Sequence, residues 1–141
     1  MQKETASSGT VGESNIQVVL STHNSEKYLP RCLNSIEKSL KGHRWILTLG
    51  DDGSSDNTLD VISAHSKNTS ANYWNVKIFP KAKNVAQAKN RVLRMAKESG
   101  EKYPIICFMD SDDEMLPERI SFLLPEYKEK KSKFIVGDYI I

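Results

Sequence analysis

Short hydrophobic runs rich in β-branched and aromatic residues recur along the chain at a regular interval. They begin at Ile16 (IQVVLS), Trp45 (WILTLG), Val76 (VKIF), Ile105 (IICFM) and Phe134 (FIVGDY), so successive starts are separated by 29, 31, 29 and 29 residues. A strand, a crossover helix and two short loops together occupy about 30 residues, so this spacing predicts repeated βαβ units. The runs are continuous rather than alternating, which predicts strands covered on both faces.

The segments between these runs have the periodicity of amphipathic helices, with apolar residues three and four positions apart. The first helix is expected over Tyr28–Leu40, and a second around Leu59–Ile62. Asp56 and Asn57 are suitable N-cap residues for the second helix. A third helix is expected from Val85 to Ala96 and should stop at Gly100. A fourth should have Pro117 in its first turn and turn Ile120, Leu123 and Leu124 inward. The sequence therefore predicts an α/β fold with a three-layer, open, mostly parallel sheet.

Length and composition indicate one globular domain. The 141 residues are 38% hydrophobic and 27% charged. The polar residues 1–15 are interpreted as a flexible leader, which leaves 16–141 as the domain. A net charge of +2 from 20 basic and 18 acidic residues gives no support to nucleic-acid binding.

Several features bear on the cellular compartment. No apolar run is long enough for a transmembrane segment, and the N-terminus lacks the apolar core of a signal peptide. Cys32 and Cys107 have no metal-ligand spacing and are interpreted as reduced core thiols. These observations favour a cytoplasmic location, either free in the cytoplasm or at the periphery of a membrane.

Three polar clusters follow predicted strands at their carboxyl ends. STHN (Ser21, Thr22, His23 and Asn24) follows the first strand, GDDGSSDNT (residues 50–58) the second, and DSDD (residues 110–113) the fourth. In open parallel sheets ligands bind at the carboxyl ends of the strands. The three clusters are therefore expected to meet along one edge.

Two of these clusters present carboxylates, and each allows a functional and a structural interpretation. Asp52, before the turn glycine Gly53, could accept a hydrogen bond from a flat heterocycle such as the imide of uracil, or the segment could simply cap a helix. Asp110 and Asp112, at i and i+2 of a strand, would point to one face and suit Mg²⁺ or Mn²⁺ completed by water and phosphate oxygens. The structural alternative is an acidic turn before a helix. No His or Cys stands nearby, which argues against zinc.

A further group of polar residues lies at the start of the third helix. Lys89, Asn90 and Arg91 could contact phosphate or a nucleobase, although a solvated helix face explains them nearly as well. The sequence contains neither a GxGxxG after a strand nor a P-loop, which disfavours a dinucleotide-binding fold and a P-loop NTPase.

The motifs VVLSTHNSEKYLPRCLNSI, DDGSSDNT, NVAQAKN and ICFMDSDDEMLPERI, in this order and spacing, resemble the family 2 glycosyltransferases of the GT-A fold. The resemblance covers nearly all of residues 16–141. It implies transfer of a sugar from a nucleotide-diphosphate donor, usually a UDP-sugar, to an acceptor hydroxyl with inversion at the anomeric carbon, assisted by Mn²⁺ or Mg²⁺.

The resemblance also implies roles for individual residues. The STHN residues would line the nucleobase and ribose pocket, and Asp52 would bind the base imide. Asp110 and Asp112 match the DxD element, with Asp110 toward the ribose and Asp112 on the metal, while Asp113 accompanies them. Lys89 stands where the family often has Arg, and Ala86 lies in a loop that is usually richer in Gly.

The resemblance leaves the acceptor and the catalytic base open. The family's general base lies well beyond the DxD element, so it is expected past Ile141, and the chain is interpreted as the donor-binding part of a larger enzyme. The acceptor could be a glycan, a lipid-linked sugar or a small molecule. One alternative is a non-catalytic fragment that binds a nucleotide sugar. A remote alternative is a phosphatase of the haloacid-dehalogenase type, which IICFMDSD superficially matches but which requires Thr or Val where this chain has Glu114.

Overall fold

The computed structural model describes residues 15–129, which form four strands and four helices that alternate along the chain. The elements are β1 (Asn15–Thr22), α1 (Leu29–Ser39), β2 (Arg44–Asp52), α2 (Thr58–Ser66), β3 (Trp74–Phe79), α3 (Val85–Glu98), β4 (Ile105–Asp110) and α4 (Arg119–Glu129). The predicted alternation of strands and helices is therefore confirmed for the first four βα units. The fifth strand, expected from Phe134, lies outside the described residues.

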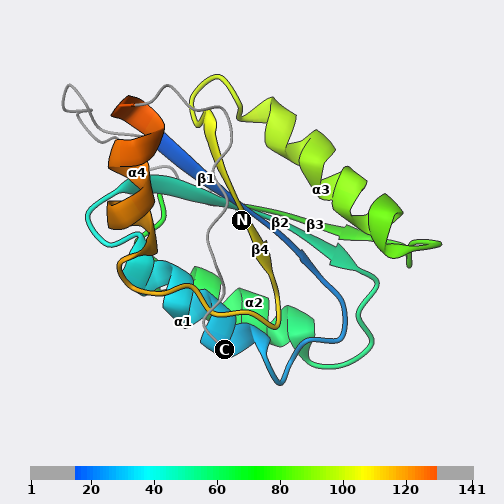
Figure 1. The fold of residues 1–141 in the computed structure, drawn as a ribbon. Coiled ribbons are helices and arrows are strands. Elements are labelled where there is room, and N and C mark those ends of the chain that lie inside the picture. Colours follow the sequence, from blue (N-terminus) through cyan, green and yellow to red (C-terminus); the bar gives the residue numbers. More distant parts are fainter. Residues whose placement is uncertain (1–14, 130–141) are drawn as a thin grey trace.

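The four strands form one parallel sheet in the order β3-β2-β1-β4. Helix α3 packs on β1 and β2 from one face, whereas α1 contacts both α2 and α4 on the other (Figure 1). The arrangement has three layers, as predicted. The chain leaves β1 toward β2 and β3, then crosses back to β4, so the order of the strands reverses between β1 and β4. Ligands of such sheets bind at a reversal of this kind.

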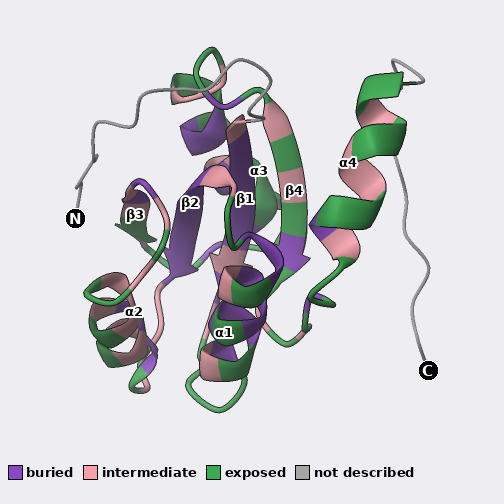
Figure 2. Cartoon of the chain, turned by 90° about the vertical axis from the view of Figure 1, so that its left-hand side faces the viewer, coloured by how far each residue is buried: buried purple, intermediate pink, exposed green. Residues whose placement is uncertain are grey.

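The two central strands carry most of the core. β1 and β2 are buried along nearly their whole length (Figure 2). Alternate residues of β1 point to opposite faces of the sheet. Val18 and Leu20 belong to the larger core under α1, while Val19 meets Val92 and Ala96 of α3. Continuous hydrophobic runs correctly predicted strands covered on both faces for this pair.

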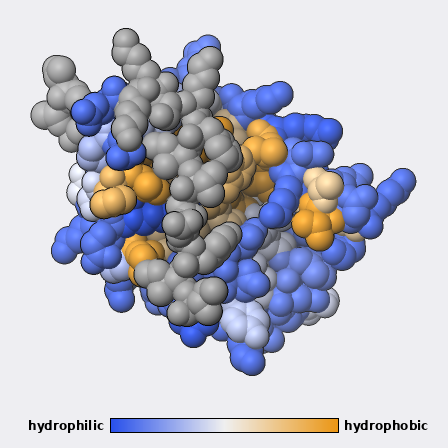
Figure 3. All heavy atoms as spheres, viewed as in Figure 1, coloured by the Kyte–Doolittle hydropathy of each residue, from blue (hydrophilic) through white to orange (hydrophobic). Residues whose placement is uncertain are grey.

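The same prediction is wrong for the two outer strands of the described sheet. Only Trp74 of β3 is buried, and β4 alternates between exposed and more buried residues. Ile106 and Phe108 of β4 keep 42% and 53% of their surface exposed. Figure 3 shows separate patches of hydrophobic surface on this side of the molecule, bordered by hydrophilic residues. A strand paired on one side only can be hydrophobic throughout and still be half covered.

The helix boundaries follow the predicted capping chemistry in part. Asn84 precedes α3, and its side chain accepts a hydrogen bond from the Gln87 amide at 2.8 Å. At α2 the predicted N-cap Asn57 makes no such bond, whereas Asp56 accepts one from the Thr58 amide at 2.9 Å. Pro117 lies two residues before α4 rather than in its first turn.

The first strand and the fourth helix lie at the two ends of the described part. β1 begins at Asn15, one residue before the expected domain boundary at residue 16, and residues 1–14 lie outside the described part. Of the α4 residues expected to face inward, Ile120 is buried and Leu124 packs against the main core. Within residues 15–129, no helix is both long and apolar enough to cross a membrane.

Candidate nucleotide-binding site

The strand register brings the three polar clusters to one edge of the sheet. Ser21 at the end of β1 is paired with Gly50 of β2 on one side and with Asp110 of β4 on the other. Thr22, one residue further, is paired with Asp51. Residues that are about 30 and 90 positions apart in sequence are thus direct neighbours. The predicted convergence of STHN, GDDGSSDNT and DSDD is confirmed.

The loops after β1 and β2 are joined by hydrogen bonds through Asn24. Its side-chain oxygen accepts hydrogen bonds from the backbone amides of Ser55 at 2.7 Å and Asp56 at 3.3 Å. The backbone amide of Asn24 donates to the Ser54 hydroxyl at 2.8 Å. Asn24 has a φ of 44°, in the left-handed region, which Asn tolerates better than most residues. The Ser25 amide adds a 2.8 Å bond to the Thr58 hydroxyl. Asn24 therefore holds the loops together, a role that its sequence position did not indicate.

The other three residues of STHN lie at different depths. Ser21 is partly exposed and lines a pocket beside Lys89 and Asp110. Thr22 is buried, and its hydroxyl has no hydrogen-bond partner among the described residues. The Nδ1 atom of His23 lies 2.6 Å from the carbonyl oxygen of Asp52, so Nδ1 is the donor because a carbonyl only accepts. STHN thus supplies one exposed hydroxyl, one buried hydroxyl and one imidazole to this edge.

Asp52 is a buried carboxylate that already has partners. Its side chain is 7% exposed, with Oδ2 accepting from the Lys81 ammonium at 2.9 Å and Oδ1 accepting from the Ala82 amide at 2.6 Å. Burial alone would raise the pKa of Asp52, but the hydrogen bonds from Lys81 and Ala82 and the Lys81 charge outweigh it, so that the pKa is lowered. Asp52 is therefore an anion held in a fixed orientation at neutral pH.

The turn after Asp52 is tight. Gly53 has the predicted positive φ, at 65°, and a Cβ atom there would lie 3.0 Å from the Lys81 backbone nitrogen. The turn can therefore bring the loop after β3 against Asp52 only with a glycine at this position. Asp51, next to it, accepts from both the amide and the hydroxyl of Ser54, at 2.9 and 2.6 Å. Of the two neighbouring carboxylates, Asp51 serves the turn and Asp52 faces the loop of Lys81.

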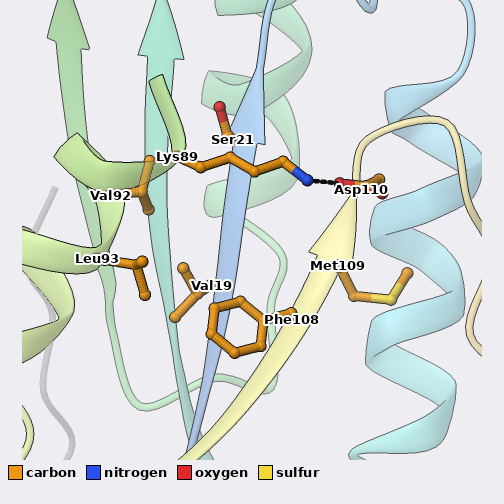
Figure 4. A pocket seen from close by; sticks show the side chains of 8 residues that line it. All are labelled: Val19, Ser21, Lys89, Val92, Leu93, Phe108, Met109 and Asp110. Carbon is orange, nitrogen blue, oxygen red and sulfur yellow. Dashed lines mark hydrogen bonds and ion pairs between the residues drawn. The ribbon is translucent and has the colours of Figure 1, made fainter. Parts of the chain in front are cut away.

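On the other side of β1, Lys89 of α3 reaches across to Asp110 at the end of β4, with 3.1 Å between Nζ and Oδ1 (Figure 4). Both side chains are more than half exposed, so the attraction between them is weak and a ligand can replace it. Val19, Phe108 and Met109 line the pocket with them. The sequence predicted Lys89 and Asp110 as separate ligand contacts, and the structure makes them partners.

The DSDD segment does not continue the strand. β4 ends at Asp110, and the Asp113 amide donates to the Asp110 carbonyl at 3.1 Å, which closes a turn. The expectation that Asp110 and Asp112 share a strand face is therefore wrong, because the alternation of side chains applies only within the strand. The Ser111 hydroxyl lies 2.9 Å from the Ser25 hydroxyl, which ties this turn to the loop after β1.

The carboxylates of this turn affect one another. Burial, followed by the negative charges of Asp112 and Asp110, raises the pKa of Asp113. Within residues 15–129 no three His, Cys, Asp or Glu side chains are arranged as a metal site. Mg²⁺ and Mn²⁺ nevertheless suit one or two carboxylates when water and phosphate oxygens complete the shell, and the exposed carboxylates of Asp110 and Asp112 fit that requirement.

Sequence reasoning missed the contacts that surround Asp52. Lys81 and Ala82 lie in the β3–α3 loop, PKAKN, and belong to no recognisable motif. Arg91, considered only as a candidate phosphate or base contact, lies 3.6 Å from Asp52. The Arg91 and Lys81 charges could have been paired with Asp52 only once the neighbouring positions of β2 and β3 were known.

The sequence model described as "Glycosyl transferase family 2" matches residues 17–141. Glycosyltransferase GlyG of Streptococcus pneumoniae serotype 4 is 33% identical over 124 residues, which are 88% of this chain and 38% of that protein. The chain belongs to the family 2 glycosyltransferases. The match also removes the basis for the phosphatase alternative.

Solved structures agree with the fold. S. aureus TarS 1–349 superimposes with a TM-score of 0.68 at 22% identity, covering 90% of this chain and 38% of that one. TarS 1–349 in complex with UDP gives 0.61 at 23% identity, with the same coverage. At this identity the similarity establishes the fold alone. The chain spans less than two fifths of the length of GlyG and of TarS 1–349.

Proposed function

We propose that this chain forms the donor-binding part of a glycosyltransferase that transfers a sugar from a UDP-sugar to an acceptor hydroxyl, with metal assistance and inversion. One observation carries the proposal: the ends of β1, β2 and β4 meet at one edge, where they place Asp52 and Asp110, and Lys89 of α3 reaches the same edge. A nucleoside diphosphate offers a base, a ribose and two phosphates in a row. An edge with separated carboxylates and cations suits a ligand of that shape.

The chemistry around Asp52 favours an imide-bearing base. A carboxylate oxygen accepts hydrogen bonds and a lysine ammonium only donates them. Asp52 Oδ2 and Lys81 Nζ are 2.9 Å apart, so they present an acceptor beside a donor. Uracil offers a complementary pair, an N–H that donates beside a carbonyl that accepts. This pairing supports UDP as the donor nucleotide.

The chemistry at the end of β4 favours a metal-bound diphosphate. Asp112 would hold Mn²⁺ or Mg²⁺, which when bound supplies positive charge to the diphosphate leaving group, and Asp110 would lie toward the ribose. Lys89 would exchange its contact with Asp110 for a phosphate oxygen, because both side chains are more than half exposed. Ser21, which is partly exposed, would contact the ribose side, and His23 would orient the backbone of Asp52. Thr22 is buried and is assigned no ligand contact.

The general base is not assigned among residues 15–129. Asp51 accepts hydrogen bonds within the turn, and Asp52 accepts one from the Ala82 amide of the β3–α3 loop. Asp110 and Asp112 are proposed to bind the donor nucleotide and its metal ion. A fragment that binds the donor without turning it over is the second candidate.

Calorimetric titration of UDP, GDP, TDP and CDP into the chain, with and without Mn²⁺, tests the proposal. We expect UDP to bind more tightly with Mn²⁺ than without it. Asp52→Ala should weaken UDP far more than pyrophosphate. Equal losses for the two ligands would show that Asp52 does not contact the base, and Mn²⁺-independent UDP binding would remove the metal from the proposal. Hydrolysis of a UDP-sugar, measured in the same samples, separates a transferase from a binding fragment.

A further inference from the structure

Arg91 of α3 is a largely buried cation that contacts Phe79, Pro80 and Asp52. Its side chain is 19% exposed. The guanidinium lies over the Phe79 ring, 5.3 Å from the centroid, and its Nη1 donates to the Pro80 carbonyl at 2.5 Å. The same Nη1 is 3.6 Å from Asp52 Oδ1. Arg91 thus joins α3, the end of β3 and the carboxylate at the end of β2.

These contacts divide the two oxygens of Asp52 between different tasks. Oδ1 is held by the Ala82 amide at 2.6 Å and faces Arg91, and both of these partners are mostly inside the protein. Oδ2 is bound by Lys81, whose side chain is 60% exposed. A ligand arriving from solvent can share or displace the lysine, but it cannot displace the backbone amide or the packed guanidinium. Oδ2 is therefore the oxygen available to a ligand.

We infer that Arg91 is a positioning residue for nucleobase recognition: with the Ala82 amide it fixes Asp52 Oδ1 and so turns Oδ2 toward the incoming base. The inference rests on the proposed function, in which Asp52 binds the base. A carboxylate fixed before binding loses little rotational freedom when the ligand arrives, and this contributes directly to affinity. Arg91 itself does not touch the nucleotide.

Arg91 also places a positive charge 3.6 Å from the Asp52 carboxylate, whose pKa is lowered chiefly by Lys81, the Ala82 amide and His23. The charged groups that face Asp52 are Lys81 from the β3–α3 loop, Arg91 from α3 and His23 from the loop after β1. Asp51 precedes it in the chain and is occupied by Ser54. Loss of a nearby positive charge raises the pKa of a carboxyl group. Removal of Arg91 should therefore raise the pKa of Asp52 and move the acid limit of base binding to higher pH.

Arg91→Met and Arg91→Lys are tested in the full chain, with Arg94→Met as the matched control because it removes the same charge from an exposed position of the same helix. UDP and pyrophosphate are titrated by calorimetry with Mn²⁺ between pH 4 and pH 8. We expect Arg91→Met to weaken UDP by about tenfold and pyrophosphate by less than about twofold, since only UDP carries a base. The pH below which UDP binding fails should rise in Arg91→Met and return toward the wild-type value in Arg91→Lys.

The outcomes are distinct. A residue that only stabilises the fold would lower the unfolding midpoint without moving the pH limit or separating UDP from pyrophosphate, and that result would overturn the inference. Should Arg91→Met fail to fold, the UDP affinity of Arg91→Lys decides. A selective loss of UDP affinity in Arg91→Lys would support the positioning role, and wild-type UDP affinity would overturn it, because the charge without the guanidinium contacts would then suffice. If the wild-type chain binds no UDP, the proposed function fails first. If it binds UDP and Arg94→Met matches Arg91→Met, only the role of Arg91 is refuted.

Discussion

Gly50 in β2 is the position at which a single methyl group would disturb both the core and the site. A Cβ atom on Gly50 would lie 2.5 Å from Val92 Cγ2 and 3.2 Å from Phe79 Cε2. Carbon atoms pack at about 3.5–4.0 Å, so Gly50→Ala requires α3 or Val92 to move by about 1 Å. Val92 is 1% exposed and has little room to rotate. The helix that carries Lys89 and Arg91 is therefore expected to shift away from the sheet.

The cost can be estimated from two opposing terms. Overpacking a core typically costs about 1–3 kcal/mol. Replacing glycine by alanine returns about 0.4–1 kcal/mol, because the unfolded chain has fewer conformations to lose. The net expectation is a loss of about 1–2 kcal/mol in the free energy of unfolding, measured by urea denaturation. Gly100→Ala is the control, since the nearest atom to its Cβ, the Lys97 carbonyl oxygen, lies at 3.4 Å.

A double-mutant cycle shows whether the contact with Val92 is the cause. Val92→Ala removes the methyl group that the new Cβ would meet. The double variant Gly50→Ala/Val92→Ala should therefore lose less stability than the sum of the two single variants, by about 1 kcal/mol. Strict additivity, or a Gly50→Ala variant as stable as Gly100→Ala, would refute this account of how α3 is seated on β2.

Three further predictions concern charge and burial. The pKa of Asp52 is lowered in the folded state, so its contribution to stability is full above about pH 4 and is lost as the pH falls through the pKa of the folded state. The difference in free energy of unfolding between the wild type and Asp52→Asn should therefore shrink below about pH 4. A constant difference would contradict the lowered pKa. The buried amide of Gln17 donates to the Ala96 carbonyl at 3.1 Å and accepts from the Thr48 hydroxyl, so Gln17→Leu should cost about 1–3 kcal/mol in urea denaturation, and no loss would mean that water replaces it. Asp112→Ala should abolish the effect of Mn²⁺ on UDP affinity, and an unchanged Mn²⁺ effect would remove Asp112 from the metal site.

The fold could be predicted from the sequence because its signal is local and repeated. Each strand is a short β-rich run, each helix has its own periodicity, and a parallel order with crossovers leaves few arrangements. The covering of a strand is not local in this sense. VKIF and IICFM are as hydrophobic as the central runs, yet they form the outer strands of the described sheet. Which run becomes an outer strand depends on the order of pairing, and composition does not encode that order.

The candidate site was predictable in its location but not in its internal contacts. Polar residues at strand ends, together with the rule for parallel sheets, were enough to bring Ser21, Asp52 and Asp110 to one edge. Whether a polar side chain holds a loop or faces a ligand depends on distances of a few ångströms between segments far apart in sequence. Asn24 bonded to the β2–α2 loop and Arg91 directed toward Asp52 are two results of that kind.

The central claim is that the loops after β1, β2 and β4 bind one nucleotide together. Amide chemical shifts of the isotopically labelled chain, followed during titration with UDP and Mn²⁺, test it most directly. The account predicts that the amides of residues 21–25, 52–58 and 110–113 shift together with one shared dissociation constant. Shifts confined to a single loop, or centred at the opposite edge of the sheet, would contradict it.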